Sequence, residues 1–436
     1  MDWKTIYNER ITTADEAVKQ IKSGNRVVLG LGAGGADAPI EAMVKNHKAY
    51  ENVEIAGMLP LVKTEYMSPG MEKHFRHNAL FISAKSRQTV SDGHGDYTPC
   101  YFYRIPLLWG EDLPVDVAII QVSTPDEHGY CSLGVSVDYT KHAVAAAKIV
   151  IAQVNKYMPR TLGDSFVHIS QMDYIIEQDE PLLSPGAPNI GEVEKAIGEH
   201  CASLVKDGDC LQLGIGAIPD AVLLFLKERR DLGIHTEMFS DGVLELVKEG
   251  VINNSKKNFN PGKMISTFLI GSQDFYEFVN NNPMVSMHPV TYTNDPFIAG
   301  QNDNLVSINS CVQVDLLGQV SSETIGMTQI SGVGGQVDFV RAAAVSKGGR
   351  SIIAMPSTAK GGTVSKIVPI LDEGAVVTTN RCDVQYIVTE HGVANLKNKT
   401  NKERARALIE IAHPSFREEL KKVFEKRFNC GYNDCG

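Results

Sequence analysis

Short apolar, β-branched runs alternate with segments of helical periodicity along this chain. Val117–Val122 and Ile149–Val154 consist mostly of aliphatic residues, and residues 352–355 repeat the pattern further on. Apolar runs of this length are typical of strands that are buried on both faces of a sheet. Between the runs, apolar residues recur at three- and four-residue spacing, which predicts amphipathic helices. Strands that alternate with helices predict an α/β fold with largely parallel sheets.

Two glycine-rich stretches in separate halves of the chain are alike. Residues 23–33 (SGNRVVLGLGA) align without a gap on residues 207–217 (DGDCLQLGIGA), and both end in G-x-G-A. Each stretch follows one helical pattern and precedes another. The repeated unit is therefore helix, strand, glycine-rich turn and helix. This duplication predicts two similar α/β domains.

A candidate linker lies between the repeats. Residues 180–189 (EPLLSPGAPN) hold three prolines and one glycine, a cluster that marks a loop rather than a regular element. We therefore predict an N-terminal domain over residues 1–183, a linker over 184–191 and a C-terminal domain over 192–436. The chain is expected to end in two helices, over residues 404–411 and 415–428.

The composition excludes several classes of protein. A chain of 436 residues, 43% of them hydrophobic, can bury two ordinary cores. Its 42 basic and 52 acidic side chains give a net charge of −10, and an acidic surface repels nucleic acids. The eight cysteines form no C-x-x-C pair and no zinc-site spacing. No apolar leader or membrane-length run is present, so we expect a cytoplasmic protein without a metal, nucleic-acid or membrane partner.

Three glycine-rich turns are candidates for ligand binding. Residues 213–218 (LGIGAI) join a strand to a helix, so their backbone N–H groups could hold a phosphate. A tight strand–helix turn that binds no ligand is an equally good interpretation of this pattern. Pro219 replaces the last glycine of a dinucleotide fingerprint, and no P-loop is present, which disfavours a dehydrogenase or an ATPase. Residues 30–35 fit a structural turn or a substrate-pocket wall. In residues 331–335 (SGVGG), N–H groups could converge on an oxyanion, or the chain could simply bend.

Glu237 is the main candidate for chemistry. It lies in residues 234–242 (IHTEMFSDG), after a strand-like position and before a helical pattern. This is the carboxyl end of a strand, where α/β sheets place functional groups. A carboxylate there could act as a nucleophile or a base, or could simply cap a helix. His235, two residues before Glu237, is expected to be a packing residue.

Two other groups are weaker candidates. Glu390 and His391 are neighbours in sequence, and neighbours on a strand point to opposite faces, so we do not expect them to cooperate. Ser123, Asp126 and His128 contain the residue types of a hydrolytic triad, but no G-x-S-x-G nucleophile elbow accompanies them.

Taken together, these motifs resemble the acetyl-CoA hydrolase/transferase family, and within it the CoA-transferases that act on 4-hydroxybutyrate or on butyryl-CoA and acetate. The resemblance extends over residues 3–428. It rests on residues 213–219 (LGIGAIP), 233–242 (GIHTEMFSDG), 329–339 (QISGVGGQVDF), 355–360 (MPSTAK) and 404–414 (RARALIEIAHP).

The resemblance implies two CoA-transferase-type α/β domains with the active site between them. Glu237 matches the family's catalytic glutamate, which carries CoA as a thioester between two carboxylic acids in a ping-pong reaction. Acyl-CoA is then a substrate, no prosthetic group is expected, and the protein is expected to be a homo-oligomer. The positions that match CoA-contacting residues of the family are Gly214, Ile215, Gly216, Ala217, Ile218, Ser331, Gly335 and Lys360.

The identity of the acyl group stays open at this stage. The turn at residues 32–37 is richer in glycine than the family's usual loop, and His391 replaces a tyrosine. Tyr97, Tyr101 and Phe102 favour an apolar pocket and a butyryl group. A 4-hydroxybutyryl group would need a polar contact that the sequence does not locate. An acyl-CoA hydrolase that uses the same glutamate, and a non-catalytic acyl-CoA sensor, are the alternatives to a transferase.

Overall fold

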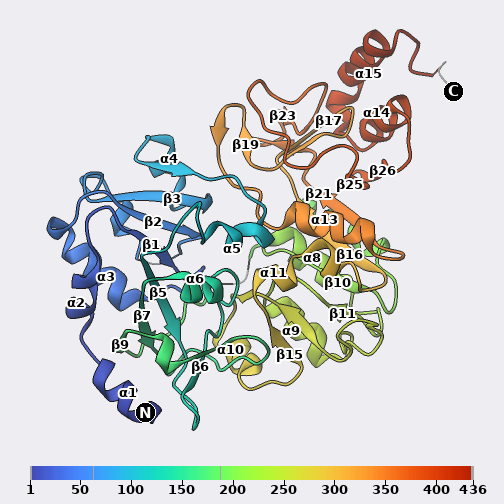
Figure 1. The fold of residues 1–436 in the computed structure, drawn as a ribbon. Helices are drawn as coiled ribbons and strands as arrows, with labels where there is room; N and C mark the ends of the chain where they lie inside the picture. Colours follow the sequence, from blue (N-terminus) through green and yellow to red (C-terminus); the bar gives the residue numbers. More distant parts are fainter. Residues whose placement is uncertain (1, 62, 187, 434–436) are drawn as a thin grey trace.

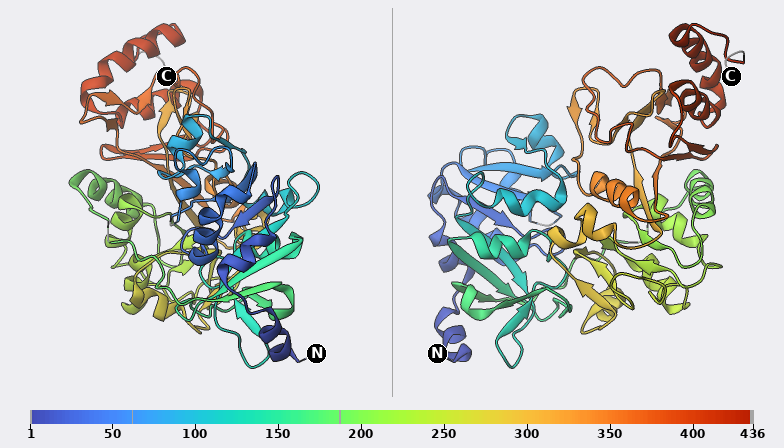
Figure 2. Two further views of the ribbon diagram at one scale, coloured as in Figure 1. Left: turned by 90° about the vertical axis from the view of Figure 1, so that its left-hand side faces the viewer. Right: turned by 45° about the vertical axis from the view of Figure 1, so that its right-hand side comes forward.

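Two mainly parallel sheets form the centres of two lobes. The computed structural model describes residues 2–61, 63–186 and 188–433. The blue-to-green N-terminal lobe and the yellow-to-red C-terminal lobe lie side by side in Figure 1 and in the right-hand view of Figure 2. No helix in the described residues is both long enough and apolar enough to cross a membrane.

The N-terminal sheet has seven strands in the order β4-β3-β2-β1-β5-β7-β9, and all neighbouring strands are parallel. Its strands are β1 (Arg26–Leu29), β2 (Val53–Met58), β3 (Phe75–Phe81), β4 (Gly95–Tyr97), β5 (Val117–Val122), β7 (Ile149–Val154) and β9 (Tyr174–Glu177). β5 and β7 are two of the apolar runs predicted as strands. Every residue of β5 is buried, because α6 (Thr140–Ala146) packs on it and it lies inside the sheet.

The C-terminal sheet has six strands in the order β11-β10-β16-β21-β25-β26. They are β10 (Cys210–Gln212), β11 (Gly233–Ile234), β16 (Leu305–Ser310), β21 (Arg350–Ala354), β25 (Tyr386–Thr389) and β26 (Gly392–Asn395). All pairs are parallel except β25 with β26, which form an antiparallel hairpin. Helix α13 (Gln336–Val345) packs on β16 and β21, and α7 (Glu192–Ser203) packs on α8 (Ala217–Leu224).

The duplicated glycine pattern corresponds to a duplicated structural unit. β1 and β10 occupy equivalent places, each between the next strand along the chain (β2 or β11) and a later crossover strand (β5 or β16). The glycines before these strands, Gly24 and Gly208, have nearly equal φ values of 77° and 79°. Gly32 and Gly216, which follow the strands, also have positive φ, a conformation that glycine adopts without the steric cost of a side chain. The expectation of two similar, largely parallel α/β units is confirmed.

The chain ends in two helices at one extremity of the C-terminal lobe (Figures 1 and 2). α14 spans Asn401–Glu410 and begins earlier than expected, because Thr400 and Glu403 form a capping box. α15 spans Pro414–Phe428, and the side chain of His413 caps its first turn by accepting from the N–H of Ser415. Both helices therefore exist, with starts set by caps that the expected boundaries did not include.

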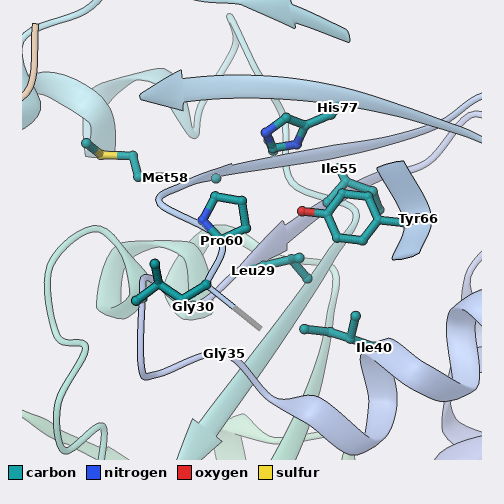
Figure 3. A pocket seen from close by; sticks show the side chains of 13 residues that line it. Leu29, Gly30, Gly35, Ile40, Ile55, Met58, Pro60, Tyr66 and His77 are labelled. Atoms are coloured by element: carbon teal, nitrogen blue, oxygen red, sulfur yellow. The ribbon is translucent and has the colours of Figure 1, made fainter. Parts of the chain in front are cut away.

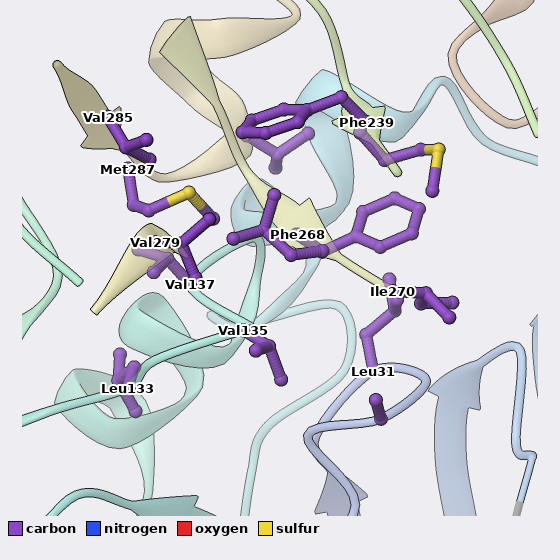
Figure 4. Close-up of a cluster of buried hydrophobic side chains, with 14 of the residues drawn as sticks. Leu31, Leu133, Val135, Val137, Phe239, Phe268, Ile270, Val279, Val285 and Met287 are labelled. Atoms are coloured by element: carbon purple, nitrogen blue, oxygen red, sulfur yellow. The ribbon is translucent and has the colours of Figure 1, made fainter. Parts of the chain in front are cut away.

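One cluster of buried hydrophobic side chains extends from one lobe into the other (Figure 4). Leu31, Val135 and Val137 from the N-terminal lobe belong to the same buried cluster as Phe268 and Ile270 from the C-terminal lobe. Burial of each such side chain contributes about 1.5–3 kcal/mol. Main-chain bonds reinforce the contact, since the N–H of Val137 donates to the carbonyl of Thr267 over 3.1 Å. The lobes therefore meet along an interface with an apolar, buried centre.

Candidate active site at the domain interface

Glu237 lies where strand β11 gives way to the short strand β12 (Met238–Phe239), at the edge of the C-terminal sheet. Its carbonyl oxygen accepts hydrogen bonds from the N–H groups of Thr267 and Phe268, over 3.0 and 3.2 Å, and from Ser266 Oγ over 2.9 Å. The backbone of Glu237 is therefore fixed by the same segment that forms the interface with the N-terminal lobe. Its predicted position after a strand is confirmed.

His235, two residues earlier, has a packing role. The imidazole is completely buried, and burial lowers its pKa to about 3, so the ring is neutral. Its Nε2 lies 2.9 Å from the carbonyl oxygen of Thr293, and Asn302 Nδ2 lies 3.1 Å from its Nδ1. Both ring nitrogens are thus satisfied by the protein, as expected for a core histidine.

A small group of buried polar side chains surrounds the carboxylate of Glu237. Asn294 Nδ2 donates to Glu237 Oε2 over 2.9 Å and lies 3.4 Å from Asp338 Oδ2. Burial raises the pKa of Glu237 to about 7; the hydrogen bond from Asn294 opposes this rise, and the charge of Asp138 adds to it. Burial also raises the pKa of Asp338 well above its ordinary value. A partly protonated carboxyl group at position 237 is therefore expected at neutral pH.

A cavity of about 210 Å³ lies in front of Glu237. The carboxyl ends of β10 and β16 form one wall, residues 331–336 form another, and Phe81 from the N-terminal lobe completes the lining. Gly335 lies directly against the carboxylate, and a Cβ at this position would overlap Glu237 Oε2. The absence of a side chain therefore lets the glycine-rich turn approach the carboxylate closely.

The predicted CoA-contacting residues fall into three places. Gly214, Ser331 and Gly335 line the cavity together with Glu237. Ile215 and Gly216 line a different cavity of about 610 Å³ beside α8, and Ala217 and Ile218 form the first turn of that helix. Lys360 is exposed on the hairpin formed by β22 (Thr358–Ala359) and β23 (Val364–Ser365). It is not one of the described residues that line the cavity around Glu237.

The N-terminal lobe holds the turn at residues 331–335 in place. The hydroxyl of Tyr97 accepts from the N–H of Val333 over 3.0 Å and donates to Glu323 Oε2 over 3.1 Å. Arg87 donates twice to the carbonyl of Ile330, over 3.2 and 3.0 Å. The N–H of Val333 is thus occupied, which leaves those of the neighbouring glycines as the candidate donors to an oxyanion.

This arrangement corrects the expectation of an apolar aromatic pocket. Tyr97 uses its hydroxyl for hydrogen bonds to the turn. Phe102 is fully buried and packs near Tyr139, and Tyr101 stacks on Tyr103. The expectation failed because adjacent aromatic residues in sequence do not indicate which of them face a cavity and which enter the core.

The weaker candidates are structural. Glu390 and His391 lie in the turn between β25 and β26, and their side chains approach to 3.5 Å. The prediction that they point apart is wrong, because strand alternation does not apply within a hairpin turn. Glu390 nevertheless accepts from the N–H of Ser357 over 2.8 Å, which gives it a structural partner. Ser123 donates to the Thr124 carbonyl, and Asp126 pairs with Arg160, so these residues form no triad.

Sequence reasoning missed Asn294, Asp338 and Asp138. Asp338 lies within residues 329–339, a motif that by itself gives this aspartate no role. Asn294 precedes a short helix, α12 (Pro296–Ala299), in a stretch that resembles an ordinary turn. No local sequence pattern links any of these three residues to Glu237. Among the described residues, no cluster of three or more His, Cys, Asp or Glu side chains is arranged to hold a metal ion.

Comparisons with known proteins agree with the geometry. Residues 1–184 match the acetyl-CoA hydrolase/transferase N-terminal domain, and residues 271–424 match the C-terminal domain of the same family. The chain is 60% identical to the 4-hydroxybutyrate coenzyme A transferase of Clostridium kluyveri over 98% of this chain and 100% of that protein. It is 39% identical to the butyryl-CoA:acetate CoA-transferase of Anaerostipes caccae, with 98% of each chain covered.

A solved structure extends the comparison to the fold. The crystal structure of 4-hydroxybutyrate CoA-transferase from Porphyromonas gingivalis superposes with a TM-score of 0.85 and 44% identity, over 98% of this chain and 100% of that one. With both halves matched and a relative of 60% identity over nearly the whole length, the chain belongs to the acetyl-CoA hydrolase/transferase family.

Proposed function

We propose that this protein is a CoA-transferase that exchanges CoA between a short-chain acyl-CoA and acetate, with Glu237 as the covalent carrier. The acyl group would be butyryl or 4-hydroxybutyryl, as in the names of the relatives. The observation that carries the proposal is the position of Glu237. Its carboxylate faces a cavity between two lobes, against a turn whose glycine lets the backbone lie close to the carboxylate.

The reaction requires no external energy source, because it exchanges one thioester for another. A Glu237 carboxylate oxygen attacks the acyl-CoA carbonyl, and the C–S bond breaks to release CoA thiolate and leave a mixed anhydride. The thiolate then attacks the glutamyl carbonyl, so that a Glu237–CoA thioester forms and the first carboxylate leaves. Acetate repeats the two steps in reverse order and departs as acetyl-CoA, which restores the carboxylate.

Each attack passes through a tetrahedral oxyanion. The N–H groups of Gly332, Gly334 and Gly335 are our candidates for its hydrogen-bond donors, and one such donor is worth roughly 3–4 kcal/mol where it has been measured. Binding of the remote nucleotide part of CoA can offset the unfavourable formation of the anhydride. Gly214, Ile215, Gly216, Ala217, Ile218, Ser331, Gly335 and Lys360 are proposed to contact CoA.

Water has to be kept from the anhydride and the thioester, since hydrolysis of either would waste the activated group. The interface beside Glu237 supports this requirement, because Phe268, whose N–H binds the Glu237 carbonyl, and the next residue, Leu269, belong to the buried core. The proposed domain division stays at residues 1–183 and 192–436. A homo-oligomeric state and a cytoplasmic location remain predictions from the sequence.

The direct test is to trap the carrier. The protein is incubated with butyryl-CoA, reduced with borohydride and digested, and mass spectrometry should locate the modified residue at Glu237. Glu237→Ala should lose both the modification and transfer, whereas Glu390→Gln, at the rival carboxylate, should retain them. Full transfer by Glu237→Ala would refute the assignment. CoA release that does not depend on acetate would instead indicate a hydrolase.

A further inference from the structure

A small cavity in the N-terminal lobe, separate from the cavity beside Glu237, contains buried polar groups (Figure 3). It lies near the ends of β1 and β2, and Gly32, Pro60, Tyr66 and His77 are among the residues that line it. Its volume is about 20 Å³. A site for one water-sized group needs about 10–15 Å³, so the space fits a single oxygen atom with its hydrogens.

Tyr66 and His77 give this cavity its polar character. Each side chain is only 3% exposed, and their ring centroids lie 5.8 Å apart. Neither the Tyr66 hydroxyl nor either His77 nitrogen makes a hydrogen bond of normal geometry with a residue that the structure describes. Figure 3 shows the Tyr66 hydroxyl directed among the lining side chains, with His77 on the neighbouring strand β3. Buried polar groups in native proteins almost always have partners.

The protonation states define the missing partner. Burial lowers the pKa of His77 to about 4, against a smaller opposing effect of the Ile55 backbone, so the neutral ring offers one donor and one acceptor. Burial raises the pKa of Tyr66, so its hydroxyl keeps its proton. No Asp, Glu, Lys or Arg is among the lining residues, which disfavours a bound ion. A hydroxyl group can both accept and donate here, whereas a methyl group would leave every polar atom unsatisfied.

The cavity adjoins a groove between the two lobes. Leu61 lines both this cavity and the groove of about 650 Å³ between the lobes. That groove shares Phe81 and Ser331 with the cavity that contains Glu237. Gly32 also faces Ile270, which follows the segment that anchors the Glu237 backbone. The groove therefore lies between the polar cavity and the candidate active site, and it shares lining side chains with each of them.

We propose that this cavity is a binding site for one hydroxyl group, held between Tyr66 and His77. The hydroxyl can come from an internal water molecule or from the terminal hydroxyl of a hydroxyacyl-CoA whose acyl chain passes Leu61. The second source rests on the proposed function, and it supplies the polar contact that separates a 4-hydroxybutyryl group from a butyryl group.

The structural test uses crystals of the wild-type protein, alone and with 4-hydroxybutyryl-CoA, together with crystals of Tyr66→Phe. We expect an oxygen atom within hydrogen-bonding distance of the Tyr66 hydroxyl, and its loss in Tyr66→Phe. An oxygen in substrate-free crystals identifies water, and one that appears only with the hydroxyacyl compound identifies substrate. No oxygen beside Tyr66 in either wild-type crystal would overturn the proposal.

Kinetics separate the two sources independently. If the substrate hydroxyl is bound, Tyr66→Phe should raise KM for 4-hydroxybutyryl-CoA about tenfold and leave KM for butyryl-CoA unchanged. If water is bound, the variant should treat both substrates alike. Tyr50→Phe is the matched control, because Tyr50 is equally buried but its hydroxyl donates to the Val18 carbonyl over 2.9 Å. Transfer by the wild-type protein from butyryl-CoA tests the proposed function separately. If no transfer is found, an oxygen beside Tyr66 in the substrate-free crystal would still establish the hydroxyl site.

Discussion

Replacement of Glu237 with glutamine should stabilise the folded protein at neutral and alkaline pH while it abolishes transfer. Burial raises the pKa of Glu237 from 4.5 to about 7, despite the hydrogen bond that Asn294 donates to its carboxylate. A raised carboxyl pKa means that the folded protein binds the proton more tightly than the unfolded chain does. Ionisation of Glu237 therefore costs stability, and the difference between 4.5 and about 7 corresponds to about 3 kcal/mol.

The sign of the effect sets the pH window. Below pH 4.5 the carboxyl group is protonated in both states, and the cost is absent. It grows as the pH rises from 4.5 to about 7 and is constant above that range. A glutamine never ionises, so the stability of Glu237→Gln relative to the wild type should increase by about 3 kcal/mol between pH 4.5 and pH 8.

Urea unfolding of both proteins across this pH range measures the difference. Glu54→Gln is a control with the opposite sign: hydrogen bonds from Arg26 and Asn78 outweigh the effect of burial and lower the pKa of Glu54. Glu54 therefore adds stability above its unfolded pKa that is lost on acidification, and its replacement should destabilise the protein most at high pH. A stability difference between Glu237→Gln and the wild type that does not vary with pH would refute the reasoning.

The other predictions concern activity. In the wild type, kcat/KM should fall about tenfold per pH unit below pH 7, and Asn294→Ala should move this fall to higher pH because it removes the bond that lowers the pKa of Glu237. Gly335→Ala should reduce kcat more than about 100-fold because its Cβ would displace the carboxylate, whereas Gly110→Ala, with open space around it, should not. Tyr97→Phe should lower kcat about tenfold with little change in KM, because it frees the turn at residues 331–335. Unchanged steady-state kinetics in Asn294→Ala, Gly335→Ala or Tyr97→Phe would contradict the corresponding contact.

The parts of the site that could be predicted from sequence are those that local structure determines. A residue just after a strand and a glycine-rich strand–helix turn keep their relation to the sheet whatever the rest of the chain does. Glu237 and Gly214 were found on this basis, and both line the cavity. The second glycine-rich turn, at residues 331–335, can also be recognised from its spacing. Its closeness to the Glu237 carboxylate cannot be predicted in this way, since it depends on how α13 packs on the sheet.

The groups that set the charge of Glu237 lie far from it in sequence. Asn294 is 57 residues away and binds the carboxylate directly, and Asp138 acts from the other lobe. Their contribution depends on the contact of the segment around Val137 with that around Thr267, which buries all of these groups together. Hydrophobic periodicity predicts that each segment is buried, but it does not predict which buried segments face one another.

The raised pKa of Glu237 follows from the same burial that keeps water away, so a change in burial alters both properties together. A more exposed carboxylate would be fully ionised at neutral pH but less basic, and its anhydride would meet more water. A more deeply buried one would be more basic but mostly protonated, and hence unable to attack a thioester. Because its pKa is raised to about 7, Glu237 is present in both the protonated and the nucleophilic form near neutral pH. The hydrogen bond from Asn294 favours the ionised form, so this one amide shifts the balance between protection from water and readiness to react.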